Sequence, residues 1–282
     1  MSTDSTTLRG HTVMVTGSTD GLGRLVAERL GATGANVLLH GRDRARGEQA
    51  RRAVEAAGGS ATFYQADFSS LAEVHRLAEA VRGDHGRLKQ LINNAGIGFG
   101  PRGQPRQISA EGHELRFAVN YLAPVLLTNL LLPPLEAAAP ARIVNVASAG
   151  QQEIDFRDPM LTRGYTGQRA YRQSKLAMIM WTTDLAEELK TRGITVNALH
   201  PATFMNTHMV HESGISPMSS VDEGADAVMH LALSHELEGW TGLYFNGVER
   251  ARPDPQAFDR EARRQLAELT EQLIGSTSAR VE

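Results

Sequence analysis

The chain has 282 residues, of which 41% are hydrophobic and 22% are charged, as in globular proteins with a sizeable core. Its formal net charge of −3 argues against a nucleic-acid partner, because phosphate binding needs a strongly basic surface. The chain has no cysteine, which excludes disulfides, thiolate metal sites and a cysteine nucleophile.

The N-terminal segment is polar and lacks the apolar centre of a secretory signal. The longest run without a charge, residues 117–135, approaches the ~20 residues of a membrane-spanning helix, but prolines, asparagines and a threonine interrupt it. A buried core helix is the better interpretation, and no membrane span is expected. Together with the lack of cysteine, these features predict a cytoplasmic protein.

Short apolar runs alternate with longer amphipathic segments along the chain. The runs predict strands at residues 11–16, 36–40, 61–65, 88–92, 142–146, 195–199 and 242–245. The amphipathic segments predict helices at residues 22–32, 43–57, 69–82, 112–132, 169–190, 221–233 and 254–274. This alternation indicates a parallel α/β sheet with helices on both faces. We expect one domain over residues 10–274, with flexible tails at 1–9 and 275–282.

Ligands of such sheets bind beyond the carboxyl ends of the strands, and a glycine-rich segment follows the first strand. Its glycines allow a sharp turn and a close approach of the backbone to a pyrophosphate. The helix that begins there directs free N–H groups at the phosphates; an ordinary glycine-rich turn is the alternative. The residues expected to form this cofactor segment are Gly17, Ser18, Thr19, Asp20, Gly21, Leu22 and Gly23.

The residues after the second and third strands bear on cofactor choice. Gly41 stands where an acid that binds the ribose diol would select NAD, and Arg42 follows it. A guanidinium there can pair with a 2′-phosphate, although a solvated arginine is the alternative. Asp67 could accept the adenine amino group or merely cap a helix, and Phe68 follows it. We therefore expect NADP(H) to be preferred, with NAD(H) as the alternative cofactor.

Small residues and an amide follow the fourth strand, at Asn94, Ala95 and Gly96. They would let a ligand pass close to the backbone, but they are also a common turn sequence. We assign them to the cofactor site.

A tyrosine and a lysine provide the clearest chemical signal. Tyr171 and Lys175 are four residues apart and share one face of a predicted helix. A lysine beside a phenol favours the phenolate and lowers its pKa. Ser148, after the fifth strand, can hold a carbonyl oxygen. These three groups suit proton transfer in a C=O/CH–OH pair, whereas an unrelated surface pair is the alternative.

Taken together, these motifs resemble the short-chain dehydrogenase/reductase family over about residues 10–247. The matching segments are TGSTDGLG (16–23), NNAG (93–96), Asn120, Ser148, YRQSK (171–175) and HPATFMNT (200–207). The resemblance implies a Rossmann-type, doubly wound, seven-stranded parallel sheet in a single domain. It also implies a nicotinamide cofactor and a catalytic group of Asn120, Ser148, Tyr171 and Lys175.

The resemblance also implies individual roles. Tyr171 would transfer the hydroxyl proton, Lys175 would hold the nicotinamide ribose, and Ser148 would orient the substrate oxygen. Asp67 and Asn94 would contact the adenosine half.

The segment after the sixth strand, with Pro201 and Thr203, would pack against the nicotinamide. Here the sequence departs from the family, since Ala202 replaces the usual glycine.

A second departure is the interval of 171 − 148 = 23 residues between the serine and the tyrosine, about twice that of most members. It resembles the retinol-dehydrogenase-like and protochlorophyllide-reductase-like branch, which favours NADP and bulky apolar carbonyls. We expect residues 151–169 to form a lid or wall of the substrate site; a surface insertion unrelated to the substrate is the alternative. The expected substrate contacts are Phe156, Met160, Tyr165, Phe204, Met205 and His208.

These features predict an oxidoreductase of type EC 1.1.1.- that transfers a hydride between NADP(H) and a carbonyl compound or a primary or secondary alcohol, with Tyr171 as the general acid or base. A catalytically silent NAD(P)-binding regulator is one alternative, but such proteins usually lose the tyrosine or the lysine. A lyase or epimerase of the extended branch is another, but those usually carry TGxxGxxG. No metal is expected, and a homo-oligomer, dimer or tetramer, is consistent with the family.

Proline at position 124 carries a further structural prediction. It has no N–H and cannot bond the carbonyl four residues back, which belongs to Asn120. We expect the helix to open locally at Asn120, as helices often do at functional sites. The freed carbonyl could hold a water that bridges to Lys175.

Overall fold

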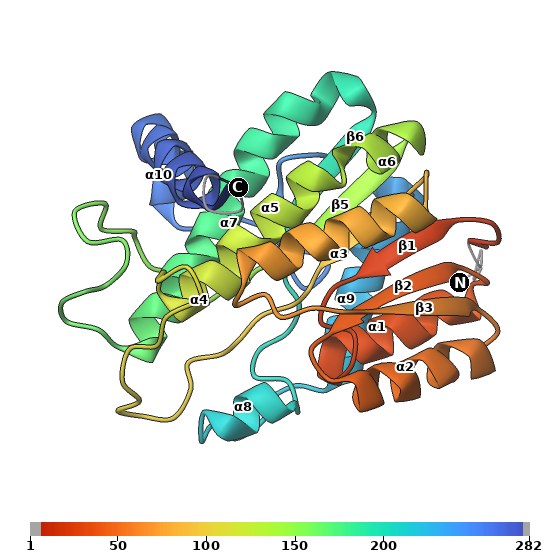
Figure 1. Ribbon diagram of the computed structural model, residues 1–282, viewed down its shortest axis with the longest axis horizontal. Coiled ribbons are helices and arrows are strands. Elements are labelled where there is room, and N and C mark those ends of the chain that lie inside the picture. The colour runs from red at the N-terminus through yellow and green to blue at the C-terminus, as the bar shows by residue number, and fades with distance from the viewer. Residues whose placement is uncertain (1–6, 279–282) are drawn as a thin grey trace.

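The computed structural model describes residues 7–278 and shows one sheet flanked by helices (Figure 1). The strand order is β3-β2-β1-β4-β5-β6-β7-β8. The strands are β1 Thr12–Val15, β2 Asn36–Gly41, β3 Ser60–Gln65, β4 Gln90–Asn93, β5 Ala141–Val146, β6 Ile194–His200, β7 Tyr244–Asn246 and β8 Glu249–Ala251.

All neighbouring strands from β3 to β7 pair in parallel. The seven predicted strands are therefore present, and the doubly wound α/β fold is confirmed. The prediction of a purely parallel, seven-stranded sheet is wrong at one edge, where β8 pairs antiparallel with β7. This strand has only three residues, Glu-Arg-Ala, and carries no apolar run that would have marked it.

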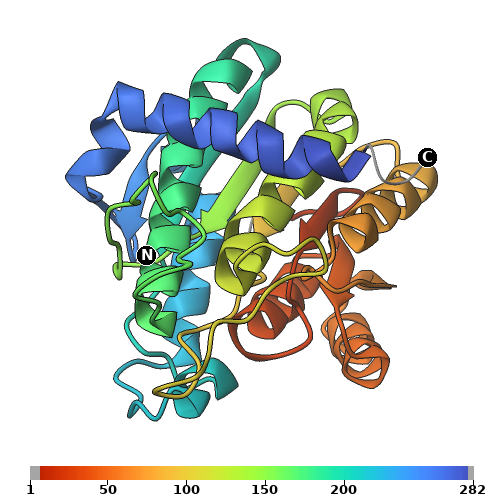
Figure 2. The same cartoon turned by 60° about the vertical axis from the view of Figure 1, so that its left-hand side comes forward.

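Helices cover both faces of the sheet (Figures 1 and 2). One layer contains α1, α2 and α9, and the other contains α3, α5, α7 and α10. The helices are α1 Gly21–Ala32, α2 Arg44–Ala56, α3 Leu71–Asp84, α4 Leu115–Phe117, α5 Ala123–Leu130, α6 Leu132–Ala137, α7 Gly167–Leu189, α8 His208–Glu212, α9 Val221–Leu233 and α10 Arg260–Ser278.

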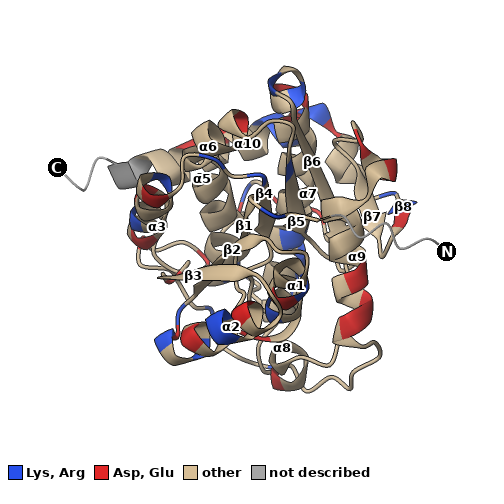
Figure 3. Ribbon diagram, turned by 90° about the vertical axis from the view of Figure 1, so that its right-hand side faces the viewer, with Lys and Arg blue, Asp and Glu red and all other residues tan. Residues whose placement is uncertain are grey.

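The hydrophobic core has two parts because side chains alternate across each strand. Val13 and Val15 belong to the cluster under α1 and α9, whereas Met14 between them belongs to the opposite cluster. Many of the charged residues belong to the helices that flank the sheet (Figure 3). Among them, the Arg29 guanidinium bonds Asp222 and Asp226 at 2.7 and 2.6 Å and so joins α1 to α9.

The long helix expected over residues 112–132 is broken in the structure. It starts only at α4 and passes through one π-helical turn, η1 Ala118–Leu122, before α5 begins. In this turn the Ala123 N–H donates to the Ala118 carbonyl, five residues back. Pro124, which has no N–H to donate, stands next in the chain. The predicted opening of the helix at Asn120 is confirmed.

Both ends of the chain differ from the expected boundaries. Leu8 is buried, and its N–H donates to the Thr33 carbonyl at 2.9 Å, so residues 7–9 are not a free tail. At the other end α10 continues to Ser278, beyond the expected end at residue 274. The rest of the two predicted tails, residues 1–6 and 279–282, lies outside the described residues.

The charge-free run that approached the length of a membrane span is divided among η1, α5 and α6. Within residues 7–278, no helix has the length and apolar character needed to cross a membrane.

Candidate active site

Four predicted catalytic residues meet at the carboxyl ends of β4 and β5. Ser148 follows β5, Asn120 lies in the π-helical turn, and Tyr171 and Lys175 lie in the first half of α7. This helix begins at a threonine cap, where the Thr166 hydroxyl accepts the Arg169 N–H at 3.1 Å. The cap fixes where α7 starts and therefore which face carries the tyrosine and the lysine.

Lys175 is a buried cation at the end of β5. Its Nζ donates to the Val146 carbonyl at 2.8 Å and lies 5.8 Å from the centre of the Tyr171 ring. Burial lowers the pKa of Lys175 to about 8. The ammonium is thus still charged at neutral pH, and it stands beside the phenol as the sequence predicted.

The pKa of Tyr171 differs from the expectation. Burial raises it above its usual value, and a hydrogen bond with Ser148 acts in the opposite direction without reversing the shift. The pKa of this phenol therefore shifts in the direction opposite to the one predicted, because the loss of water around the ring outweighs the Ser148 hydrogen bond. Tyr171 is a protonated phenol at neutral pH.

Asn120 connects the loop after β4 to α7. Its Nδ2 donates to the Ile97 carbonyl at 3.1 Å and to the Ser174 hydroxyl at 3.0 Å, and its Oδ1 accepts the Ile97 N–H at 2.8 Å. The Ser174 hydroxyl in turn donates to the Tyr171 carbonyl at 2.7 Å. The fully buried amide therefore fixes the positions of other site residues.

The glycine segment lies against the loop after β4. Gly17 has a φ of 63°, and a Cβ there would stand 2.8 Å from the Ala95 Cα, so only glycine suits this position. The Asn94 Nδ2 donates to the carbonyls of Thr16 and Gly17 at 2.9 and 3.1 Å. In the structure Asn94 thus fastens the glycine segment, and its contact with the adenosine half stays a prediction.

His40, which the sequence analysis missed, supports the same segment from β2. Its Nδ1 accepts the Gly17 N–H at 3.1 Å, and its Nε2 lies 3.1 Å from the Ala66 carbonyl. These partners require a neutral ring with the proton on Nε2. The ring also stacks on Phe68 at 4.2 Å, and burial lowers the pKa of His40 to about 4. A histidine inside the apolar run NVLLHG was the available signal, since buried polar groups need partners.

The charged residues near the ends of β2 and β3 form long ion pairs at the surface. Arg42 is exposed, and its Nη1 lies 3.9 Å from an Asp67 carboxylate oxygen. The other Asp67 oxygen accepts the Ser69 N–H at 2.8 Å, the capping role given as the alternative. Asp20 caps α1 and lies 3.4 Å from Nη1 of Arg46, a second arginine that the sequence analysis did not single out.

The other expected cofactor residues divide into two groups. Ser18, Leu22 and Phe68 are buried and support the loops; the Ser18 hydroxyl accepts the His40 N–H at 3.0 Å. Thr19, Gly21 and Gly23 lie along the glycine segment, and Gly96 lies just after β4. After β6, Pro201 is buried and Thr203 is exposed.

The comparisons with known proteins agree with this arrangement. Residues 11–216 match the model of the family described as short chain dehydrogenase. The chain belongs to this family. It is 35% identical to retinol dehydrogenase 13 of Homo sapiens, over 95% of this chain and 86% of that protein. It is 32% identical to retinol dehydrogenase 12 of Homo sapiens, over 95% and 87% of the two chains.

Solved structures of other proteins share the fold. An uncharacterized protein from Mycobacterium paratuberculosis superimposes with a TM-score of 0.77 and 28% identity, over 95% of each chain. RhlG of Pseudomonas aeruginosa, solved as an NADP active-site complex, superimposes with a TM-score of 0.71 and 27% identity, over 87% of this chain and 97% of that one. The protein is therefore a dehydrogenase of the short-chain family, whose members use NAD(P)(H) on alcohol and carbonyl substrates.

Several of the expected substrate residues pack against the hydrophobic core and are not fully available to a substrate at the catalytic group. Phe156 and Met160 are partly buried and pack against the core cluster beneath α7. Met205 packs against the opposite cluster, and Phe204 has a left-handed backbone with a φ of 44°, which is strained for a residue other than glycine. His208 is exposed at the start of α8. Their contacts with substrate stay predictions.

Phe99 is a neighbour of the catalytic tyrosine that the sequence analysis missed. Its ring meets the Tyr171 ring edge-on, with centres 4.7 Å apart and an angle of 86°. The residue lies in the loop after β4, which has no regular structure, so no sequence pattern marked it.

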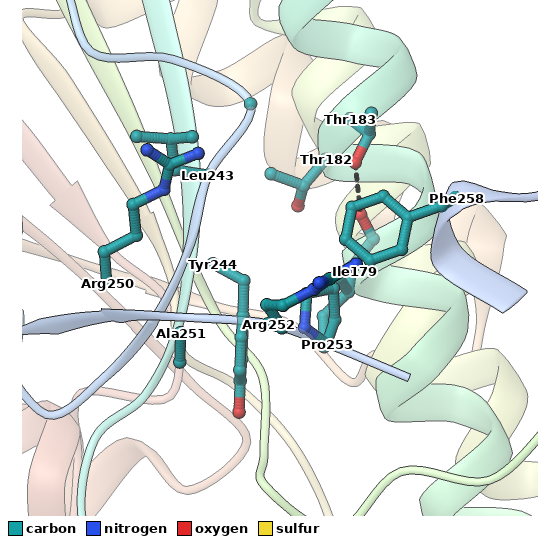
Figure 4. A pocket seen from close by; sticks show the side chains of 11 residues that line it. Ile179, Thr182, Thr183, Leu243, Tyr244, Arg250, Ala251, Arg252, Pro253 and Phe258 are labelled. Carbon is teal, nitrogen blue, oxygen red and sulfur yellow. Dashed lines mark hydrogen bonds between the residues drawn. The ribbon is translucent and has the colours of Figure 1, made fainter. Parts of the chain in front are cut away.

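A cavity of about 500 Å³ lies away from this catalytic group. It lies between α7, the β7–β8 hairpin and the turn η4 Pro255–Phe258 (Figure 4). Its lining includes Ile179, Thr183, Arg252 and Phe258. One lining residue, Tyr244, contacts the site, since its hydroxyl donates to the Ser148 carbonyl at 3.1 Å.

Replacing His40 should weaken the dependence of stability on pH. The unfolded chain takes up a proton near the ordinary pKa of 6.5, whereas folded His40 does so only near about 4. The free energy of unfolding therefore falls as the pH falls from 6.5 to 4, and this group accounts for about 2 kcal/mol of loss by pH 5. We expect His40→Gln to remove that part of the pH dependence.

Urea unfolding at pH 7 and pH 5 measures this effect. His11→Gln is the control, because His11 is an exposed histidine and its loss should leave the pH dependence as in wild type. If His40→Gln and wild type lose the same stability between the two pH values, the buried neutral ring does not act in this way.

Proposed function

We propose that the protein is an NADP(H)-dependent oxidoreductase that interconverts a bulky, apolar carbonyl compound and its alcohol. The observation that carries this proposal is the meeting of Ser148, Tyr171 and Lys175 beside the glycine segment. A proton donor, a hydroxyl that can hold the carbonyl oxygen and a buried cation stand together at one edge of the sheet.

The residues present fit a nicotinamide cofactor. Asn94 and His40 hydrogen-bond the backbone of Gly17 and fix its conformation. The helix α1 begins at Gly21, so a pyrophosphate would lie at its N-terminus, where helices present backbone N–H groups. Lys175 would hold the nicotinamide ribose. When bound, the cofactor supplies or accepts the hydride.

The protein's own groups handle the proton. In reduction the Tyr171 phenol, protonated at neutral pH because burial raises its pKa, gives its proton to the carbonyl oxygen. The Ser148 hydroxyl, bonded to the phenol, orients that oxygen. The Lys175 ammonium then stabilises the phenolate that forms, because opposite charges attract strongly where water is excluded.

Preference for NADP(H) is supported by the end of β2. Arg42 is exposed, and its ion pair with Asp67 is long, at 3.9 Å. Its guanidinium is therefore free to turn toward a 2′-phosphate. No acid stands at Gly41 to bind a free ribose diol. RhlG, which shares the fold, was solved as an NADP complex.

A bulky apolar substrate is supported by two features. The similar proteins named above are retinol dehydrogenases. In this chain the catalytic tyrosine faces the ring of Phe99. This ring would contact apolar surface of a substrate near the carbonyl.

Removing the phenol hydroxyl tests the proton-transfer role. We expect Tyr171→Phe to lower kcat by ~10²–10⁴-fold, the usual contribution of a general acid, while NADPH affinity stays within a few-fold. Turnover on a panel of ketones and aldehydes, together with NADPH fluorescence titration, measures both quantities. Tyr64→Phe is the matched control, since the Tyr64 hydroxyl bonds Asp84 on α3, away from the catalytic group. A Tyr171→Phe rate above about a tenth of wild type would refute the role.

Cofactor choice is tested at Arg42. We expect wild type to favour NADPH in kcat/KM and Arg42→Ala to reduce that preference by about ten- to a hundredfold, because a charge-assisted guanidinium–phosphate contact contributes ~1.5–3 kcal/mol. Arg44→Ala, which removes another exposed arginine two residues away, should leave the ratio unchanged. A wild-type enzyme that prefers NADH would show that Arg42 does not select the cofactor.

A further inference from the structure

Arg116 of α4 is a buried guanidinium, 2% exposed, that none of the steps above uses. Burying an arginine is costly unless hydrogen bonds replace its water, and this one is fully engaged. Its Nε donates to the Gly98 carbonyl at 2.8 Å, and its Nη2 donates to the Phe99 carbonyl at 2.6 Å and the Gln104 side chain at 3.3 Å. All three acceptors belong to the loop after β4, here called the β4 loop, residues 97–107.

The fourth hydrogen bond reaches a different segment. Arg116 Nη1 donates to the Tyr165 hydroxyl at 2.7 Å, in the insertion between the catalytic serine and tyrosine. The β4 loop and this insertion lie on the same side of the molecule (Figure 1). A second link runs from the Arg106 Nε to the Met160 carbonyl at 2.8 Å. One buried side chain therefore joins the two segments that flank the catalytic group.

A carboxylate balances the buried charge. Glu114 is 1% exposed, and one of its oxygens lies 3.6 Å from the Arg116 Nη1. Its other oxygen accepts the Phe117 N–H at 2.7 Å, which fixes the start of α4. The distance of 3.6 Å between the two groups is too long for a hydrogen bond. The guanidinium therefore forms its hydrogen bonds with the two loops.

One of these hydrogen bonds connects Arg116 with the catalytic tyrosine through Phe99. The Phe99 carbonyl is held by Arg116, and the Phe99 ring lies edge-on against Tyr171. Gly167, at the start of α7, packs so closely on the Phe99 carbonyl that a Cβ there would overlap it. The backbone of Phe99 is thus confined between the guanidinium and α7.

We propose that Arg116 is a positioning residue that sets the substrate-side wall of the site. It holds Phe99 against Tyr171 and, through Tyr165, makes the insertion and the β4 loop one unit, so that the space beside the phenol has a fixed shape. The expected effect of Arg116 on activity rests on the proposed function, whereas its expected effect on the coupling of the two loops does not.

Exchange of backbone amides tests the coupling without any substrate. In Arg116→Gln, amide hydrogen exchange should become faster in residues 97–107 and 155–166 together, because both lose the shared donor. In Tyr165→Phe, which keeps the guanidinium and its bonds to the β4 loop, it should become faster in 155–166 only. Arg263→Gln is the control, since Arg263 is a mostly buried arginine bound to Asp184 on α7.

If Arg116→Gln leaves exchange in both segments as in wild type, or if the Arg263→Gln control loosens them equally, the proposal is wrong. Should Arg116→Gln fail to fold, Tyr165→Phe and Arg116→Lys carry the same test. A lysine keeps the charge but lacks the planar fork that reaches several acceptors, so it should loosen both segments. Wild-type exchange in the Lys variant would show that only the charge matters.

Activity tests the link to Tyr171. We expect Arg116→Gln and Phe99→Ala each to lower kcat/KM on a bulky ketone by about tenfold or more, as small displacements near a reacting centre do, with NADPH affinity unchanged. If the arginine acts through Phe99, the double variant should be no worse than Phe99→Ala alone. Additive losses would overturn that link. A wild-type protein without turnover would refute the proposed function and leave the exchange result to decide the role of Arg116.

Discussion

The side-chain amide of Asn120 is the contact on which the candidate site depends. It bonds both backbone groups of Ile97 and the hydroxyl of Ser174, so the loop after β4 and the catalytic helix are held at one separation. This amide lies in the π-helical turn η1. A regular α-helix would rotate the residues after this turn, since the extra residue of a π-turn shifts the face that follows.

A chain of buried amides and hydroxyls continues this arrangement below the site. The Asn93 Nδ2 at the end of β4 bonds Asn145 Oδ1 on β5 at 2.9 Å, and the Asn145 Nδ2 bonds the Thr182 hydroxyl of α7 at 2.8 Å. All three side chains are buried. Because an unpaired buried polar group is costly, the chain favours a single register of β4, β5 and α7, and so a single position for the lysine and tyrosine above it.

The sequence predicted the parts of this molecule whose signals are local. Apolar runs located the parallel strands, and the spacing of Tyr171 and Lys175 placed both on one helix. Pro124 predicted where the helix that carries Asn120 widens into a π-turn, because the N–H that proline lacks would have bonded the carbonyl four residues back. In contrast, β8 is too short to have a pattern, and the helix expected from residue 112 begins only at Leu115.

The residues that were missed have partners far along the chain. His40 contacts Gly17 and Ala66, and Phe99 meets Tyr171. Arg116 likewise looks like an ordinary surface arginine until the insertion folds over it. Such roles arise from tertiary contacts between loops, which have no periodic pattern to read. For the same reason the sequence misjudged the pKa of Tyr171, since burial is a property of the folded site.

Burial shifts the two central groups of the site in opposite directions. It raises the pKa of the Tyr171 phenol and lowers that of the Lys175 ammonium to about 8, because in each case it disfavours the charged form. At neutral pH both groups hold their protons, which is the state that reduction of a carbonyl requires. As the pH rises past about 8 the lysine loses its charge first, and a phenolate at Tyr171 then loses the stabilisation that the ammonium gives it. The site therefore holds, near neutrality, both the proton that reduction transfers and the positive charge that stabilises the phenolate left behind.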